Sequence, residues 1–221
     1  MTGYIDDYWL GRLERTKRNL EKNGFEVHLA ADAAEAAQLA TEVILPAVKT
    51  AEGRFVVSFG GSMSVAACGL HDSLKTRDDL TVIDTTDYTV AREEMVARRR
   101  RALTCDLFIT SANALVEDGR LVNLDNLGNR VAALAFGPTH ALLIIGRNKL
   151  ATSLEEAMRR VKDVAAPINA ARLNRKTPCV KTRQCEDCAS PDRICSVWTI
   201  TEKSMPKGRV KIILVNAELG F

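Results

Sequence analysis

Four of the six cysteines lie close together near the C-terminus, and their type and spacing give the clearest chemical signal in the sequence. They are arranged as Cys179-x5-Cys185-x2-Cys188-x6-Cys195. Two thiolates in a C-x2-C step can reach one ion, and two more in the same loop can complete a tetrahedral set of sulfur ligands. Such a set suits zinc or an iron–sulfur cluster, and the spacing is neither that of a zinc ribbon nor that of a ferredoxin. The sequence therefore predicts a metal site but does not distinguish zinc from an iron–sulfur cluster.

The predicted metal has two alternative roles. A closed site would hold together the cysteine-rich loop, residues 174–198, because metal binding supplies folding energy directly. An iron–sulfur cluster would instead carry electrons. Thiols that bind nothing, or that form redox disulfides, are a third alternative.

A glycine-rich turn is the second candidate site. Gly60-Gly61-Ser62-Met63-Ser64 follows a predicted buried strand at 55–59 and precedes a predicted helix at 65–75. Glycines there let backbone N–H groups turn towards a ligand, and a helix N-terminus favours an anion. The alternative is a tight turn in which Ser62 or Ser64 caps the helix, since neither a Walker loop nor a complete G-x-G-x-x-G is present. The candidate ligand-binding residues are Gly60, Gly61, Ser62 and Ser64.

A second turn, Glu117-Asp118-Gly119, places two carboxylates beside a glycine. Glu117 could act as a nucleophile or general base if it is partly buried, because desolvation raises the pKa of a carboxyl group. A solvated turn is the alternative. Asn123 and Asp125 then make the following segment polar, as in a ligand-contacting loop or a helix cap, and both are candidate ligand residues with Asp118 and Gly119.

His140 is the histidine that we single out as a candidate ligand residue, because it directly precedes a predicted buried strand. The only basic run is Arg98–Arg101 on a predicted helix at 90–103. Glu94 and Arg98 are spaced to pair along that helix, which favours a solvated face, with a patch for an anion or an acidic partner as the alternative.

The elements that must position these residues are short apolar runs separated by helical stretches. Runs of this kind are typical of strands buried on both faces, and helices between them make the sheet mainly parallel. The predicted fold class is therefore α/β, a mainly parallel sheet flanked by helices with a cysteine-rich loop near its end. The predicted strands are 55–59, 80–83, 107–109, 141–145 and 210–215.

The chain divides into an N-terminal helical segment with one strand, residues 1–50, and an α/β domain, residues 51–216. Apolar residues from Trp9 to Leu20 recur at helical spacing, and a strand is expected at 25–29. Asp118-Gly119 predicts a hairpin that joins 114–116 to 121–124.

Composition excludes several classes of protein. Hydrophobic residues at 46% and charged residues at 27% are typical of a globular chain rather than a disordered one. The net charge of +3 is too small to argue for nucleic acid or an anionic membrane as partner. No apolar run approaches the roughly 20 residues of a membrane span, and the N-terminus lacks the layout of a signal peptide. We therefore expect a cytoplasmic protein, in which cysteines are thiols or metal ligands.

In order and spacing, four segments resemble the LUD domain family, the lactate utilization proteins of the LutC and YkgG type. The similarity covers about residues 50–216 and implies a fold like that of the NagB, RpiA and CoA-transferase group, with its site at the strand ends. The segments are Gly60–Ser64, Ala112–Leu124, Gly137–His140 and the cysteine-rich loop.

The resemblance also implies a function. Many members have Glu-Thr-Gly and a small residue where this chain has Glu117-Asp118-Gly119-Arg120, and CoA transferases use a glutamate in a similar turn as acyl acceptor, which makes Glu117 the first catalytic candidate. The family implies an accessory protein or subunit that binds a small anionic metabolite, and an oligomer is compatible with this role. It would serve the oxidation of lactate or a similar acid to pyruvate, together with iron–sulfur partner proteins. The chain has no flavin or nicotinamide fingerprint. The alternatives are a stand-alone enzyme of the CoA-transferase or sugar-phosphate isomerase kind that uses Glu117, and a metal-stapled regulatory module.

Overall fold

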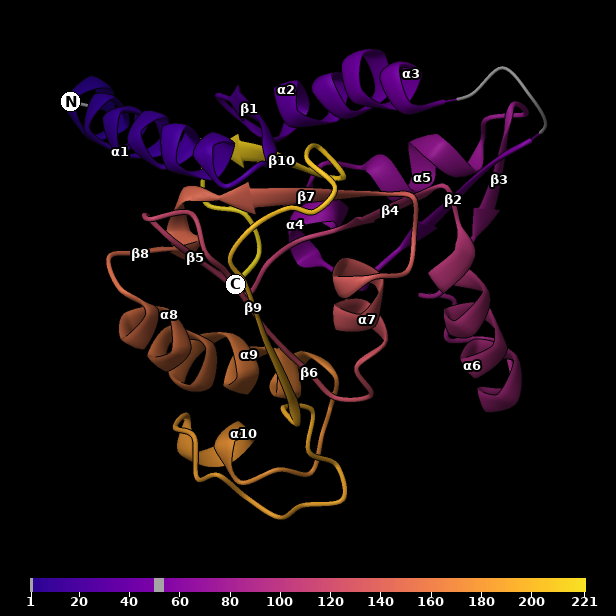
Figure 1. The fold of residues 1–221 in the computed structure, drawn as a ribbon. Coiled ribbons are helices and arrows are strands. Elements are labelled where there is room, and N and C mark those ends of the chain that lie inside the picture. Colours follow the sequence, from indigo (N-terminus) through magenta and orange to yellow (C-terminus); the bar gives the residue numbers. More distant parts are fainter. Residues whose placement is uncertain (1, 50–53) are drawn as a thin grey trace.

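A six-stranded parallel sheet forms the centre of the protein (Figure 1). The computed structural model describes residues 2–49 and 54–221. The α/β class and the mainly parallel sheet are thus confirmed, whereas the boundary predicted between residues 50 and 51 lies outside the described residues. The strand order is β1 (Glu26–Ala30), β10 (Val210–Val215), β7 (His140–Gly146), β4 (Leu107–Thr110), β2 (Phe55–Phe59) and β3 (Leu80–Ile83).

Helices and a second sheet cover the two faces of this sheet. Along β7, Leu142 and Ile144 belong to one core, and Leu143 and Ile145 belong to the other. This is the pattern of a strand buried on both faces. The first face is covered by α2 (Ala33–Gln38), a π-turn at Leu39–Ile44, α3 (Leu45–Val48), α4 (Met63–Ala67) and α5 (Leu70–Lys75). The other face is covered by α1 (Thr2–Lys22), α7 (Asn129–Ala135) and the second sheet.

The second sheet contains the predicted hairpin. Its order is β8 (Leu150–Ala151), β5 (Ala114–Val116), β6 (Leu121–Asp125) and β9 (Val197–Thr201). The β5 and β6 strands are antiparallel, as the Asp118-Gly119 turn predicts. The sequence pattern does not predict β9, a half-exposed edge strand that begins at the end of the cysteine-rich loop. The far side of this sheet packs on α8 (Leu154–Arg160) and a π-turn at Val161–Ala165, which leads into α9 (Ala166–Arg172).

The remaining helices are short. The predicted helix at 65–75 is interrupted at Gly69, where φ is +65° and α4 gives way to α5. The predicted helix at 90–103 is α6 (Arg92–Arg101) with a 3-10 turn at Ala102–Thr104. Within the cysteine-rich loop only α10 (Cys179–Thr182) is helical. Over residues 2–49 and 54–221, no helix combines the length and apolarity that a bilayer crossing needs.

Gly119 lets the β5–β6 turn pack closely against α1. Its φ is +95°, and a Cβ there would lie 3.1 Å from the backbone of Asn19 and of Leu20. Gly208 has a φ of +76°, but the nearest atom to its Cβ would be a Glu26 oxygen at 4.0 Å. We expect Gly208→Ala to lower the free energy of unfolding by about 1–2 kcal/mol, the cost of a left-handed residue alone. Gly119→Ala should cost more because α1 must also move. Urea unfolding of both variants measures the difference, and equal losses would contradict the close packing.

Candidate functional site

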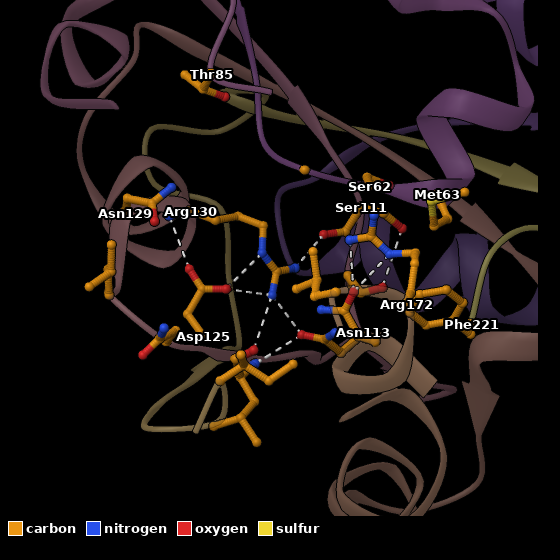
Figure 2. A pocket seen from close by; sticks show the side chains of 18 of the residues that line it. Ser62, Met63, Thr85, Ser111, Asn113, Asp125, Asn129, Arg130, Arg172 and Phe221 are labelled. Carbon is orange, nitrogen blue, oxygen red and sulfur yellow. Dashed lines mark hydrogen bonds and ion pairs between the residues drawn. The ribbon is translucent and has the colours of Figure 1, made fainter. Parts of the chain in front are cut away.

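A cavity of about 200 Å³ opens at the carboxyl ends of the parallel strands (Figure 2). Its walls include residues that follow four strands of the main sheet: Gly61 after β2, Thr85 after β3, Ser111 after β4 and Lys149 after β7. Ligands of open α/β sheets bind at this edge. The second sheet, α6, α9, the cysteine-rich loop and the C-terminal Phe221 complete the walls.

Lys149 lies at the base of the cavity with only 3% of its surface exposed. Its Nζ donates hydrogen bonds to Ser64 Oγ at 2.8 Å, Ser111 Oγ at 3.1 Å and the Ala112 carbonyl at 3.2 Å. Within the described residues no carboxylate contacts this amine. Burial, together with the positive charges of Arg160 and Arg130, lowers the pKa of Lys149 to about 7. The amine is therefore able to gain or lose a proton near neutral pH.

Arg130 is held rigidly at the side of the cavity. Its Nε and Nη2 donate to Asp125 Oδ1 at 2.9 and 2.7 Å, a side-on ion pair in which both side chains are 11% exposed. Its Nη1 donates to Asn123 Oδ1 at 2.8 Å and its Nη2 to Asn113 Oδ1 at 2.7 Å. Figure 2 shows the guanidinium at the centre of these bonds. Asp125 also accepts a bond from the backbone N–H of Arg130 and so fixes the start of α7.

The mouth of the cavity is cationic. Arg99 from α6, Arg172 from α9 and Arg175 just beyond α9 line the cavity, to which Arg130 and Lys149 also contribute. The only side-chain carboxylate among the described lining residues is that of Asp125, which Arg130 already engages. Arg172 donates from Nε and Nη2 to Asn169 Oδ1, at 3.0 and 2.8 Å, and this neutral partner leaves the charge of Arg172 uncompensated. The cavity is therefore suited to an anion.

Six of the ten predicted catalytic and ligand residues lie at or behind this cavity. Gly61, Ser62 and Asp125 line it. Ser62 also accepts a bond from the Val65 N–H as the cap of α4. The other three lie behind the lining: Ser64 holds Lys149, Asn123 holds Arg130, and Gly60 packs so close to Thr110 that a Cβ would lie 2.6 Å from Thr110 Oγ1.

Glu117, Asp118 and Gly119 lie instead in the turn that contacts α1. Arg12 Nε donates to Glu117 Oε1 at 2.6 Å, and Arg15 Nη2 donates to Oε2 at 2.5 Å. Both carboxylate oxygens are therefore engaged by α1, and none of the three residues lines the cavity. A nucleophilic role for Glu117 stays a prediction.

His140 begins β7 and so stands at the amino end of that strand, opposite the edge with the cavity. Burial lowers the pKa of its imidazole, and the positive charge of Lys211 adds to this effect. Its role as a ligand residue also stays a prediction.

The cysteine-rich loop lies against the same cavity. Arg193 donates to the carbonyls of Cys188 at 2.6 Å and Cys195 at 2.8 Å, so it draws two of the cysteines together. Burial raises the pKa of the Cys195 thiol, and the nearby Cys185 and Cys188 thiolates raise it too. In the described residues, however, no three cysteine, histidine or acidic side chains are gathered as metal ligands. As arranged here, the four thiols do not form a coordination sphere.

The loop is tied to the site at its end. Ile194 lines the cavity, and the Ser196 N–H donates to the Asp125 carbonyl at 2.7 Å. The end of the cysteine-rich loop is therefore bonded directly to the backbone of Asp125.

Sequence reasoning did not single out Lys149, Arg130, Ser111, Asn113, Arg172 or Arg175. The sequence carries little signal for Lys149, because it ends a polar segment, Arg147-Asn148-Lys149, between the apolar run that ends at Ile145 and Leu150-Ala151. A lysine in such a segment is usually exposed. Arg99, which belongs to the basic run, lines the cavity.

Comparisons with known proteins identify the family of this chain. One solved structure similar to this chain is a DUF162 family protein from Deinococcus radiodurans, with 15% sequence identity and a TM-score of 0.49, over 94% of this chain and 98% of that one. No curated protein matches the sequence. The sequence profile of the LUD domain matches residues 13–215, which is nearly the whole chain. The chain therefore belongs to the LUD domain family.

Proposed function

We propose that this LUD domain protein binds a small carboxylate metabolite of the lactate or pyruvate class in the cavity, and that it serves the oxidation of such an acid together with iron–sulfur partner proteins. The observation that carries the proposal is the surplus of positive charge around the cavity. Arg99, Arg172, Arg175 and Lys149 have no carboxylate partner among the described residues.

The size and chemistry of the cavity favour a small acid. Its volume of about 200 Å³ is below the roughly 300–1,000 Å³ of pockets for drug-sized ligands. Guanidinium groups bind carboxylates through paired hydrogen bonds. The serine hydroxyls and asparagine amides that line the walls can orient a hydroxyl or carbonyl next to that carboxylate. The chain has no dinucleotide fingerprint, so electrons from the acid would pass to a partner protein.

Thermal unfolding with and without acid tests the binding. At a ligand concentration about 100-fold above Kd, binding adds about 2.7 kcal/mol, which for a chain of this size raises Tm by about 5–10 °C. We expect such a rise with lactate or pyruvate and none with the matching neutral amides. Arg172→Gln should reduce the rise, because it removes one unpaired guanidinium. Arg159→Gln is the control, since Arg159 is 67% exposed and pairs with Glu155 on α8. An equal rise in the two variants would contradict the cationic mouth as the binding site.

Lys149 provides a second test, because a buried ammonium without a carboxylate weakens the fold. Replacing a buried ion pair with apolar side chains of similar volume often stabilises a protein by about 1–4 kcal/mol, because the charges no longer have to be desolvated. We expect Lys149→Met to raise the free energy of unfolding below pH 7 by an amount in this range, and to abolish the rise in Tm caused by pyruvate. A variant that loses stability and keeps that rise would show that Lys149 serves only the structure.

The effect of Lys149 on the free energy of unfolding should depend on pH in a defined direction. Between the folded pKa of Lys149, about 7, and its ordinary value of 10.5, the unfolded chain holds a proton that the folded protein lacks. The free energy of unfolding then rises with pH in this window. The advantage of Lys149→Met should therefore shrink as pH rises above 7, as measured by urea unfolding of both proteins on either side of that pH.

The cysteine-rich loop is the second part of the proposal: its four thiols bind zinc or an iron–sulfur cluster. The C-x2-C spacing of Cys185 and Cys188 supports this, and so do the bonds from Arg193 to the carbonyls of Cys188 and Cys195, although the thiols would have to move to share one ion. Anaerobic purification followed by metal, sulfide and absorption analysis tests it. Iron with acid-labile sulfide would favour a redox role, and one zinc per chain would favour a structural one. A protein without metal, all of whose thiols react freely, would contradict the metal site.

A further inference from the structure

Lys149 differs from Lys211, the other lysine with a buried side chain among the described residues. Lys211 is 6% exposed, and its Nζ forms an ion pair with the Glu26 carboxylate. Lys149 is 3% exposed and has only hydroxyl and carbonyl partners. Lys211 thus shows how this fold neutralises a buried lysine, and Lys149 lacks that arrangement. The same contrast favours the uncharged amine at Lys149, which is the form that attacks a carbonyl.

The hydrogen bonds around Lys149 leave its lone pair towards the cavity. The Ser64 hydroxyl donates to the Leu219 carbonyl at 2.9 Å, so Ser64 Oγ can only accept from Lys149. The Ala112 carbonyl also only accepts. An uncharged amine that donates its two N–H groups to these acceptors directs its lone pair to the side of Ser111. Ser111 lines the cavity, and its own bond to the Ala112 carbonyl is long, at 3.3 Å, so its hydroxyl is free to turn.

Two features near this amine fit a 2-oxo acid. Arg172 lines the same cavity, and because its Nε and Nη2 bond only to the neutral Asn169 side chain, its charge and its Nη1 are available to a carboxylate. In a 2-oxo acid the reactive carbonyl carbon is directly bonded to the carboxylate, and an anchored carboxylate therefore limits where that carbon can lie. Burial and the charges of Arg160 and Arg130 lower the pKa of Lys149 to about 7, so a large fraction of the amine is uncharged near neutral pH.

We infer that Lys149 captures a 2-oxo acid such as pyruvate as a covalent imine. Nζ forms a bond to the carbonyl carbon as the carbonyl π bond breaks, and one proton of the amine passes to the oxygen to give a carbinolamine. The hydroxyl takes the second proton of the nitrogen and leaves as water, and the nitrogen lone pair forms the double bond to carbon. Nothing is oxidised or reduced in this step. A 2-hydroxy acid such as lactate has no carbonyl, so it can bind but cannot form the bond, and Lys149 thereby distinguishes the oxidised acid from the reduced one.

This inference rests on the proposed function, and reductive trapping tests it separately. The full-length protein is incubated with pyruvate and cyanoborohydride, which converts an imine to a stable secondary amine, and the labelled lysine is located by peptide mass analysis. We expect one carboxyethyl group per chain, on Lys149 and not on Lys211. Lactate should give no label. Lys149→Arg, which keeps the charge and the donors but lacks the amine, should lose the label, and Lys149→Met should lose it as well.

Thermal unfolding of the same samples separates the possible failures. If pyruvate raises Tm but labels no lysine, the imine is overturned and the binding function stands. If pyruvate neither raises Tm nor labels the protein, both are overturned. Label that is spread over exposed lysines, and that persists in Lys149→Arg, would also overturn the inference, because it would reflect ordinary surface amines.

Discussion

The buried amine of Lys149 is the constraint on which the site depends. An ammonium taken out of water without a carboxylate costs several kcal/mol unless close hydrogen bonds replace its hydration. Here the replacement comes from segments that are distant in sequence: Ser64 after β2, and Ser111 and Ala112 after β4. Ser64 in turn holds the Leu219 carbonyl, which ties the C-terminal segment to the same point. The segments that follow β2 and β4 and the C-terminal segment are thus fixed relative to one another by one side chain.

The second sheet is anchored at both ends of its β5–β6 strand pair. At one end, the β5–β6 turn is gripped by α1 through Arg12 and Arg15 on Glu117. At the other end, Asp125 closes β6, holds Arg130 and accepts the Ser196 N–H of the cysteine-rich loop. A carboxylate thus anchors each end of the strand pair, one to a helix and one to the cavity. This division explains why two acidic residues close in sequence serve different purposes.

The parts that could be predicted from sequence are those with local causes. Strands buried on both faces must be apolar at every position, so the runs at 55–59 and 210–215 are visible without a structure. The turn at Gly60–Ser64 was also visible, because glycine and serine are what a close strand-to-helix turn needs. The strand β9 was not, since an edge strand with one face towards solvent carries a weak pattern.

Lys149 and Arg130 could not be assigned from sequence for a different reason. Lys149 matters because no carboxylate of the described residues contacts it. Arg130 matters because its side-chain partners come from two segments, Asn123 and Asp125 on β6 and Asn113 before β5. Spacing along the chain encodes neither. Glu117 illustrates the converse, because a carboxylate beside a glycine in a turn has the same local pattern whether it faces a substrate or a helix. The burial of Glu117 comes from α1, about a hundred residues earlier. Only the packing of that helix therefore determines whether the carboxylate binds arginines of α1 or faces a substrate.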